Sequence, residues 1–196
     1  MLTSKGARRI APDGQESTSM SEIETLKQIV VYENEFVTVF DDVVKFPSGK
    51  NGTYFRYRWK APHGVAIVPI HGCDVILIQN YRYAEKSLSI EVPQGFGCFG
   101  RTPQEDASRE LFEETGLTAQ KFEQLLVLGA DFKTFVFVAE IDDLAQVSNQ
   151  NAEVSESISS YRRIPIEKIS HLDFGAAGIF DPVTIAALLA LRSIRT

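Results

Sequence analysis

The 196-residue chain contains only two cysteines, Cys73 and Cys98, and three histidines. Two cysteines are too few for a disulfide framework, and neither has the CxxC or Cys/His spacing that a zinc site requires. The sequence therefore excludes a disulfide-stapled domain and a zinc site of this kind. We expect reduced thiols in a cytoplasmic protein.

Long hydrophobic runs are also missing. The apolar stretches, such as 65–70 and 185–191, are much shorter than the roughly 20 residues that a membrane helix needs, and no apolar signal core lies near Met1. We therefore expect no membrane span and no membrane partner. Residues 1–20 are polar and end at a second methionine, so we interpret 1–27 as a flexible leader or tag-like segment.

Basic residues are outnumbered, with 20 lysines and arginines against 26 aspartates and glutamates and a net charge of −6. This sign disfavours the cationic surface of an unspecific nucleic-acid-binding protein, so we expect no nucleic-acid partner. A protein of negative net charge must bind a phosphate-bearing ligand through local groups, which are selected arginines, backbone amides or a bound metal. At 44% apolar residues, the composition fits one compact domain with a small lobe.

The hydrophobic pattern predicts strands, a helix, further strands and a second helix. Short β-rich runs indicate an antiparallel N-terminal β-lobe at 28–60. Two nearly continuous apolar strands around a turn at 71–74 begin the buried sheet of a second domain at 61–196. This order indicates an α+β fold or a mixed-sheet sandwich. Further strands are expected at 125–130, 134–140 and 160–164.

Two local patterns mark helix starts. Residues 102–105 read Thr-Pro-Gln-Glu, a capping box with proline at the first helical position, and Gly116 is a C-terminal stop signal. A helix of about three to four turns is predicted between them. Asp181 before Pro182 predicts the start of the last helix in the same way.

The first of these helices carries a stripe of carboxylates. Asp106, Glu110 and Glu114 are spaced by four residues, and Glu113 lies on the same face. Like charges at this spacing cost about 0.2–0.5 kcal/mol per pair, so the stripe calls for a neutralising cation. A divalent metal would supply it. Oxygen ligands without histidine or cysteine favour Mg²⁺ or Mn²⁺, with a phosphate ester or diphosphate as the ligand.

Taken alone, these acids also fit an ordinary solvated helix face on which Glu105, Arg109 and Glu113 alternate in charge. The glycine-rich segment 93–100, directly before the helix, favours the metal site. Such a loop lets the backbone approach a ligand closely and can aim a carbonyl at a metal. The loop on its own would also fit a tight turn.

Together these residues resemble the Nudix hydrolase signature. Its pattern is glycine, five residues, glutamate, seven residues, Arg-Glu, an aliphatic residue, any residue, Glu-Glu, any residue, glycine and an aliphatic residue. One position departs, because Arg101 replaces the first glutamate, which in the family mainly supports the loop and helix electrostatically. The remaining positions are filled at the correct spacing by Gly95, Arg109, Glu110, Leu111, Glu113, Glu114, Gly116 and Leu117.

The resemblance covers roughly residues 28–195, and the segments 64–70, 75–83 and 91–95 look like the ADP-ribose pyrophosphatase-like branch. It implies a Nudix α/β/α sandwich with a mixed sheet and a β-lobe that helps to form a homodimer. It also implies a hydrolase, dependent on Mg²⁺ or Mn²⁺, that splits the diphosphate of ADP-ribose or a nucleotide sugar and releases a nucleoside monophosphate. The alternative is a Nudix-fold nucleotide-binding module with weakened catalysis, suggested by Arg101 and a shortened connection at 128–135.

The resemblance also assigns site residues. It gives Glu110, Glu113 and Glu114 catalytic and metal-binding roles and makes the backbone carbonyl of Gln94 a further metal ligand. Substrate binding is assigned to Arg82, Glu91 and Gly95.

The family's marker for ADP-ribose substrates is missing, since no proline lies between Pro103 and Pro165. In the family, the longer loop at that place also presents a catalytic acid. A general base could instead come from the polar loop that holds Glu153 and Glu156, although two acids in such a loop also fit plain solvation.

Overall fold

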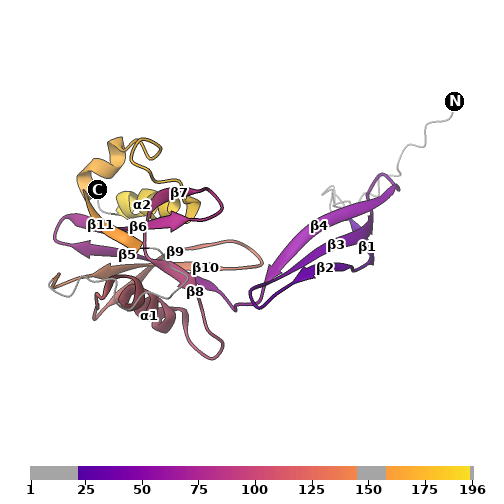
Figure 1. Ribbon diagram of the computed structural model, residues 1–196, viewed down its shortest axis with the longest axis horizontal. Helices are drawn as coiled ribbons and strands as arrows, with labels where there is room; N and C mark the ends of the chain where they lie inside the picture. The colour runs from indigo at the N-terminus through magenta and orange to yellow at the C-terminus, as the bar shows by residue number, and fades with distance from the viewer. Residues whose placement is uncertain (1–21, 145–157, 195–196) are drawn as a thin grey trace, which may run out of the picture. The chain divides into compact units, whose positions relative to one another are not determined.

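The computed structural model describes residues 22–144 and 158–194. The chain divides between Arg58 and Trp59 into two units, which are described separately below (Figure 1). The predicted base candidates Glu153 and Glu156 lie outside the described residues, as does the predicted leader up to residue 21.

The N-terminal unit is built around strand β3 (Val37–Lys45), which pairs with β1 (Glu24–Lys27), β2 (Val30–Glu33) and β4 (Asn51–Trp59). The pairings of β1 and β2 with β3 are antiparallel. Alternate residues of β3 are buried, as the period of a strand with one covered face requires.

The start of this sheet corrects the predicted end of the leader. Residues 24–27, which we placed in the leader, form β1 and pair with Val43, Val44 and Lys45 of β3. All four side chains of β1 are exposed. Backbone hydrogen bonds and a surface ion pair of Glu24 with Lys45 hold this edge strand. Because it buries no side chain, it has no hydrophobic pattern by which the sequence could reveal it.

The second unit contains a seven-stranded mixed sheet. Its main strand order is β11-β6-β5-β10-β9, with β7 paired to β6 and β8 paired to β5. β5 and β10 are parallel, and the other pairings are antiparallel. The strands are β5 (Gly64–His71), β6 (Asp74–Arg82), β7 (Ser87–Glu91), β8 (Gln94–Phe96), β9 (Phe122–Leu128), β10 (Thr134–Glu140) and β11 (Ile158–Pro165).

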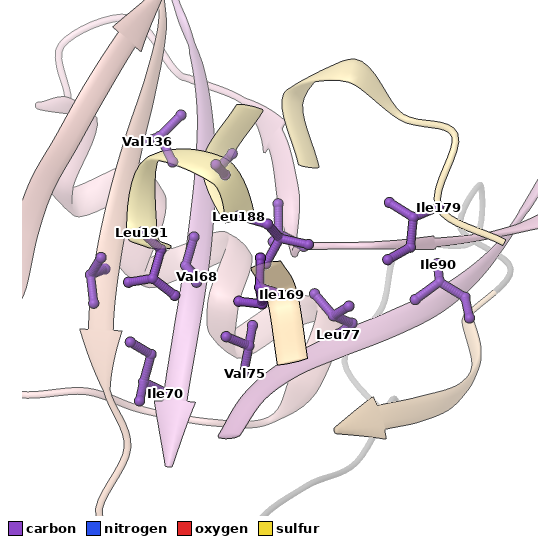
Figure 2. Close-up of a cluster of buried hydrophobic side chains, with 14 residues drawn as sticks. Val68, Ile70, Val75, Leu77, Ile90, Val136, Ile169, Ile179, Leu188 and Leu191 are labelled. Atoms are coloured by element: carbon purple, nitrogen blue, oxygen red, sulfur yellow. The ribbon is translucent and has the colours of Figure 1, made fainter. Parts of the chain in front are cut away.

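Helices cover both faces of this sheet, as predicted for an α/β/α sandwich. Val65 and Ile67 of β5 pack with Leu111 of α1 (Pro103–Thr115). Val68 of β5 instead belongs to a second cluster, with Leu188 of α2 (Pro182–Ile194) (Figure 2). The short 3₁₀ helix η1 (Ile166–His171) adds to the second cluster. Burial on both faces explains why β5 reads as an almost continuous apolar run.

The helix and hairpin predictions are confirmed. α1 and α2 begin after Thr102 and Asp181, and β5 and β6 form the predicted hairpin with Ile70 opposite Val75. Within the described ranges, neither helix combines the length and apolar character that a membrane crossing needs.

Candidate active site

Local capping interactions fix the position of α1. The Thr102 hydroxyl accepts a hydrogen bond from the Glu105 backbone N–H, and the Glu105 carboxylate accepts one from the Thr102 backbone N–H at 2.7 Å. The Thr102 backbone N–H and the Thr102 hydroxyl both donate to the Glu105 carboxylate and, together with the positive charge of Arg101, hold the pKa of Glu105 below its usual value. Gly116 ends the helix in the left-handed conformation, with φ of 71°. The helix therefore presents a fixed face to the sheet.

Glu110 lies on this face, against the glycine-rich loop. Its side chain is buried, and a Cβ atom at Gly95 would stand 2.3 Å from its carboxylate. Only glycine leaves room for this approach, because real Cβ contacts are never so short. The spacing between Gly95 and Glu110 in the sequence is thus explained by their contact in the fold.

Glu114 lies one turn further along the same face. It is 2% exposed, and its Oε2 atom accepts a hydrogen bond of 2.9 Å from the Gln94 backbone N–H. Two buried glutamates of α1 therefore meet two successive residues of β8, Gln94 and Gly95. The predicted cluster of Glu110, Glu114, Gln94 and Gly95 is brought together.

Glu113 points elsewhere, toward Arg109. The Arg109 guanidinium lies 2.6 Å from Glu113 Oε2 and 2.7 Å from Glu110 Oε1, and it donates to the Phe96 carbonyl at 2.8 Å. Burial alone would lower the pKa of Arg109, but the charges of Glu110 and Glu113 raise it above its ordinary value. Arg109 is therefore a permanent cation that links both glutamates to the loop.

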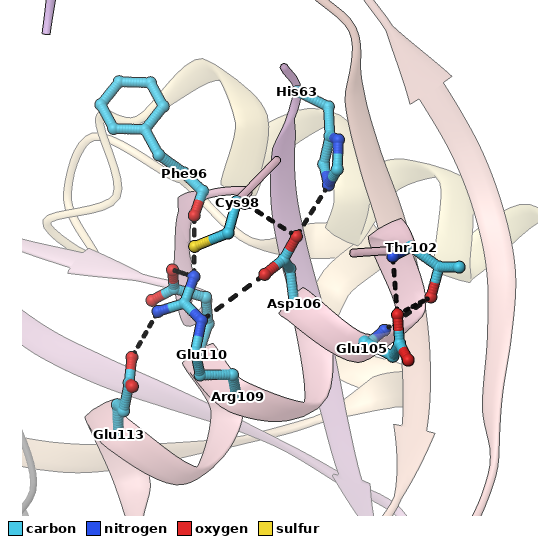
Figure 3. A network of polar contacts seen from close by, with 9 residues as sticks. All are labelled: His63, Phe96, Cys98, Thr102, Glu105, Asp106, Arg109, Glu110 and Glu113. Carbon is cyan, nitrogen blue, oxygen red and sulfur yellow. Dashed lines mark hydrogen bonds and ion pairs between the residues drawn. The ribbon is translucent and has the colours of Figure 1, made fainter. Parts of the chain in front are cut away.

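Asp106 corrects the interpretation of the whole stripe as a metal site. It is fully buried, and its Oδ2 atom lies 3.0 Å from His63 Nε2 and accepts a 3.0 Å hydrogen bond from the Cys98 backbone N–H (Figure 3). Its Oδ1 atom lies 3.5 Å from Arg109 Nε. Asp106 is thus neutralised by the protein itself, so its burial does not call for a metal.

Arg82 and Glu91 form a second polar pair. Arg82 Nε donates to Glu91 Oε1 at 2.9 Å, and Arg82 Nη2 contacts the other carboxylate oxygen. Glu91 is almost completely buried and also accepts from the Gln94 side-chain amide at 3.2 Å. The hydrogen bonds that Arg82 donates to the Glu91 carboxylate raise the pKa of Arg82, against the effect of burial. Glu91 therefore orients Arg82, whose side chain is 41% exposed.

Two pockets adjoin Arg82. One, of about 280 Å³, reaches Gly95 and is lined by Phe96 and Phe132. The other, of about 400 Å³, is lined by Ser87, Ser89 and Phe180, among others. Arg82 and Asp181 line both pockets. The predicted substrate residue Arg82 therefore stands between two spaces, one of which leads to Gly95 and Glu110.

The carboxylates at this site match the needs of a divalent cation. Across 22–144 and 158–194, no three histidine, cysteine or acidic side chains converge into a ready metal site. Mg²⁺ in proteins is commonly held by one or two carboxylates, completed by water and substrate phosphate. The buried carboxylates of Glu110 and Glu114, with backbone groups of β8 beside them, fit that requirement. Glu113 is engaged with Arg109.

Sequence reasoning missed several residues around this site. No pattern around His63 indicates a role at the site, yet it contacts Asp106 across 43 positions of the chain. Ser89 and Phe132 were not singled out at all. The four-residue spacing of the carboxylates draws attention to Asp106 in the sequence. No local pattern indicates which residues contact Asp106 in the fold.

The fold and these contacts define a Nudix-type domain. A sequence model described as "NUDIX domain" matches residues 60–183. This match covers more than half of the chain, so the chain belongs to the Nudix family.

Two curated relatives and one solved structure give further detail. "ADP-ribose pyrophosphatase" of Bacillus subtilis (strain 168) is 28% identical over 125 residues, covering 61% of this chain and 66% of that protein. "Methanol dehydrogenase activator" of Bacillus methanolicus is 29% identical over 106 residues, covering 54% of this chain and 56% of that protein. The structure of an "ADP compounds hydrolase" has a TM-score of 0.73 at 22% identity and covers 91% of this chain and 96% of that one.

These similarities confirm the α+β Nudix fold and the resemblance to the ADP-ribose pyrophosphatase-like branch. They also agree with the predicted class, a Nudix-type pyrophosphohydrolase. The aligned part is 66% of the first relative and 56% of the second.

Proposed function

We propose that this protein is a divalent-metal-dependent pyrophosphohydrolase. Its substrate is a nucleoside diphosphate linked to a second group, either ADP-ribose or a nucleotide sugar, and one product is a nucleoside monophosphate. The observation that carries this proposal is the place of Arg82, an oriented cation between two pockets, one of which reaches Gly95 beside Glu110. A substrate in which a diphosphate joins two bulky groups matches this arrangement, with the diphosphate at Arg82 and one group in each pocket.

In this proposal, Glu110 and Glu114 hold the cation, Mg²⁺ or Mn²⁺, together with the Gln94 carbonyl. When bound, such a cation neutralises phosphate charge and lowers the pKa of the attacking water. Glu113 either shares this binding or positions the water. Glu153 and Glu156 remain the candidates for the general base.

Substrate binding is assigned to three residues in this scheme. Arg82 binds the diphosphate, because a guanidinium matches phosphate oxygens in charge and geometry. Glu91 takes part by holding Arg82 in place, since its own carboxylate is buried against that side chain. Gly95 contributes space, because its missing side chain lets the Glu110 carboxylate lie against the backbone that lines the smaller pocket.

The nucleoside half of the substrate fits the aromatic pocket. Phe96 is 40% exposed, and its ring lies 5.8 Å from that of Phe132, centroid to centroid. Aromatic side chains favour nucleobases because stacking contributes about 1–3 kcal/mol per base. The name of the Bacillus subtilis relative, "ADP-ribose pyrophosphatase", supports ADP as the nucleotide.

We further propose a cytoplasmic homodimer. Both described cysteines are free thiols, which suits a reducing compartment. The N-terminal unit exposes large apolar side chains that a second copy of the chain would cover. The most exposed of these are Val30, Val31, Tyr32, Phe36, Phe55 and Tyr57.

The test is turnover with Mg²⁺ and, separately, Mn²⁺, over ADP-ribose, nucleotide sugars, dinucleotides and nucleoside triphosphates, with products resolved by chromatography. We expect metal-dependent release of a nucleoside monophosphate from an ADP-ribose or nucleotide-sugar substrate. Ligand binding without turnover across the whole panel would overturn the proposal and favour the weakened binding module.

A pair of charge-removing variants localises the chemistry. Glu114→Gln should remove most of the turnover, because a metal ligand is lost, while leaving the circular dichroism spectrum unchanged. The matched control is Glu123→Gln, which removes an exposed carboxylate on β9. A Glu114→Gln rate equal to that of the wild type would show that the site assignment is wrong.

A further inference from the structure

We infer that the larger pocket beside Arg82 binds the hydroxyl-rich group, a sugar, on the second phosphate of the substrate, and that Ser89 hydrogen-bonds to it. This inference rests on the proposed function and adds to it the position and recognition of the second group. Beside Arg82, the pocket is lined by Glu85, Ser87, Ser89, Phe180 and Asp181, among others.

The first observation is an unpartnered buried hydroxyl. Ser89 is only 4% exposed, and its Oγ atom has no hydrogen-bond partner among the described residues. A buried hydroxyl without a partner costs free energy, so an unpaired group of this kind requires an explanation. Because Ser89 lines the pocket, a ligand hydroxyl can supply the missing partner.

Position in the sheet does not explain the serine. Ser89 stands opposite Asn80 in the pairing of β6 with β7. The Asn80 Oδ1 atom is also buried and also lacks a partner, so the two side chains do not satisfy one another. An apolar strand residue would avoid the cost of burial at this position. A polar residue is therefore better explained by the pocket than by the strand.

The second observation is the charge of the pocket wall. Arg82 is its one cation and is already paired with Glu91, while Glu85 and Asp181 add carboxylates. The Asp181 Oδ2 atom is held by the backbone N–H and the hydroxyl of Thr184, both at 2.6 Å. A further phosphate would be repelled here. A neutral sugar instead finds carboxylate acceptors and serine hydroxyls.

The two pockets also differ in a way that orients the substrate. The smaller pocket has the paired rings of Phe96 and Phe132, and the larger one has the hydroxyls of Ser87 and Ser89. We therefore place the nucleobase on the aromatic side and the sugar on the serine side, with the diphosphate at Arg82.

The experiment compares Ser89→Ala with a matched control, Ser170→Ala, which removes an exposed hydroxyl that is bonded to the Glu167 carbonyl. Two ligands are titrated by calorimetry without a divalent cation: ADP-ribose, and the β-methyl ester of ADP, which has no second sugar. Because a neutral hydrogen bond is lost, Ser89→Ala should weaken ADP-ribose binding about two- to tenfold. Binding of the methyl ester should stay unchanged in both variants.

The melting temperature of the ligand-free protein separates binding from a structural role. Ser89→Ala should melt at the same temperature as the wild type or higher, because an unpaired buried hydroxyl is removed. A lower melting temperature with unchanged ADP-ribose affinity would overturn the inference, as would equal weakening for both ligands. If turnover persists in those cases, the proposed function survives. If the wild-type protein binds neither ligand, both the inference and the proposed substrate class fail.

Discussion

The Nε2 atom of His63 lies 3.0 Å from the Oδ2 atom of Asp106, and both side chains are buried. This pair joins the residue before β5 to the first turn of α1. The loop between β8 and α1 is held by the same two residues, because Gly97 N–H donates to the His63 carbonyl and Cys98 N–H to the Asp106 carboxylate. A Cβ atom at Gly97 would stand 2.2 Å from the His63 ring. The glycine loop is therefore tied to the helix that carries the glutamates.

Replacing Asp106 by asparagine should destabilise the fold. The change leaves Arg109 and His63 facing a neutral amide, and breaking a buried pair from one side costs about 3–5 kcal/mol. Urea unfolding measures this loss. The control is Glu105→Gln, which removes an exposed carboxylate in the same turn of α1 and weakens only the cap, so its loss of stability should be clearly smaller. Equal losses in the two variants would show that Asp106 has no special role.

Gly95→Ala should reduce turnover more than it reduces stability. The added Cβ atom would lie 2.3 Å from the Glu110 carboxylate, so either the glutamate or β8 must move. Overpacking costs about 1–3 kcal/mol, whereas a shift of about 1 Å at a catalytic group can lower kcat about a hundredfold. The comparison is with Gly175→Ala, where the nearest atom would be 3.5 Å away. If kcat is unchanged for Gly95→Ala, the close approach has no role in catalysis.

Arg101→Glu tests the departure from the family signature. Arg101 is exposed, while the buried Asp106 already faces Arg109, so restoring the family's acid at position 101 adds only an exposed charge. Exposed ion pairs contribute about 0–1 kcal/mol, which predicts a change in kcat within about fivefold. Steady-state kinetics with the best substrate of the panel measures it. A much larger gain would indicate a crippled site and would favour the weakened binding module.

Tyr161 gives a prediction for alkaline pH. Burial raises the pKa of its phenol to about 12, and the negative charge of Glu114 contributes further. Since the folded pKa lies above the unfolded value near 10, the stability that this residue contributes is present below pH 10 and is lost as the pH rises through 12. Between pH 10 and pH 12, the free energy of unfolding should therefore fall more steeply in the wild type than in Tyr161→Phe.

Urea unfolding at a series of pH values measures that difference. Tyr54→Phe, which changes an exposed tyrosine of β4, serves as the control and should follow the wild-type curve. Parallel curves for wild type and Tyr161→Phe would contradict the raised pKa.

Elements whose signals are local can be predicted from the amino-acid sequence alone. Thr102, Pro103 and Glu105 specify the start of α1 because their hydrogen bonds and backbone angles involve only neighbouring residues. Gly116 specifies its end for the same reason. The apolar run of β5 follows from burial on both faces, and the signature spacing places Glu110 and Glu114 on one face of a helix.

Which side chains these residues contact depends on the tertiary structure. The carboxylate stripe looked uniform in the sequence, yet Asp106 pairs with His63, Glu113 pairs with Arg109, and Glu114 accepts from β8. The pocket that contains Ser89 likewise joins residues from β6, β7 and the start of α2. Such contacts depend on how strands and helices pack over long separations in the chain, and side-chain packing at that range leaves no periodic pattern in the sequence.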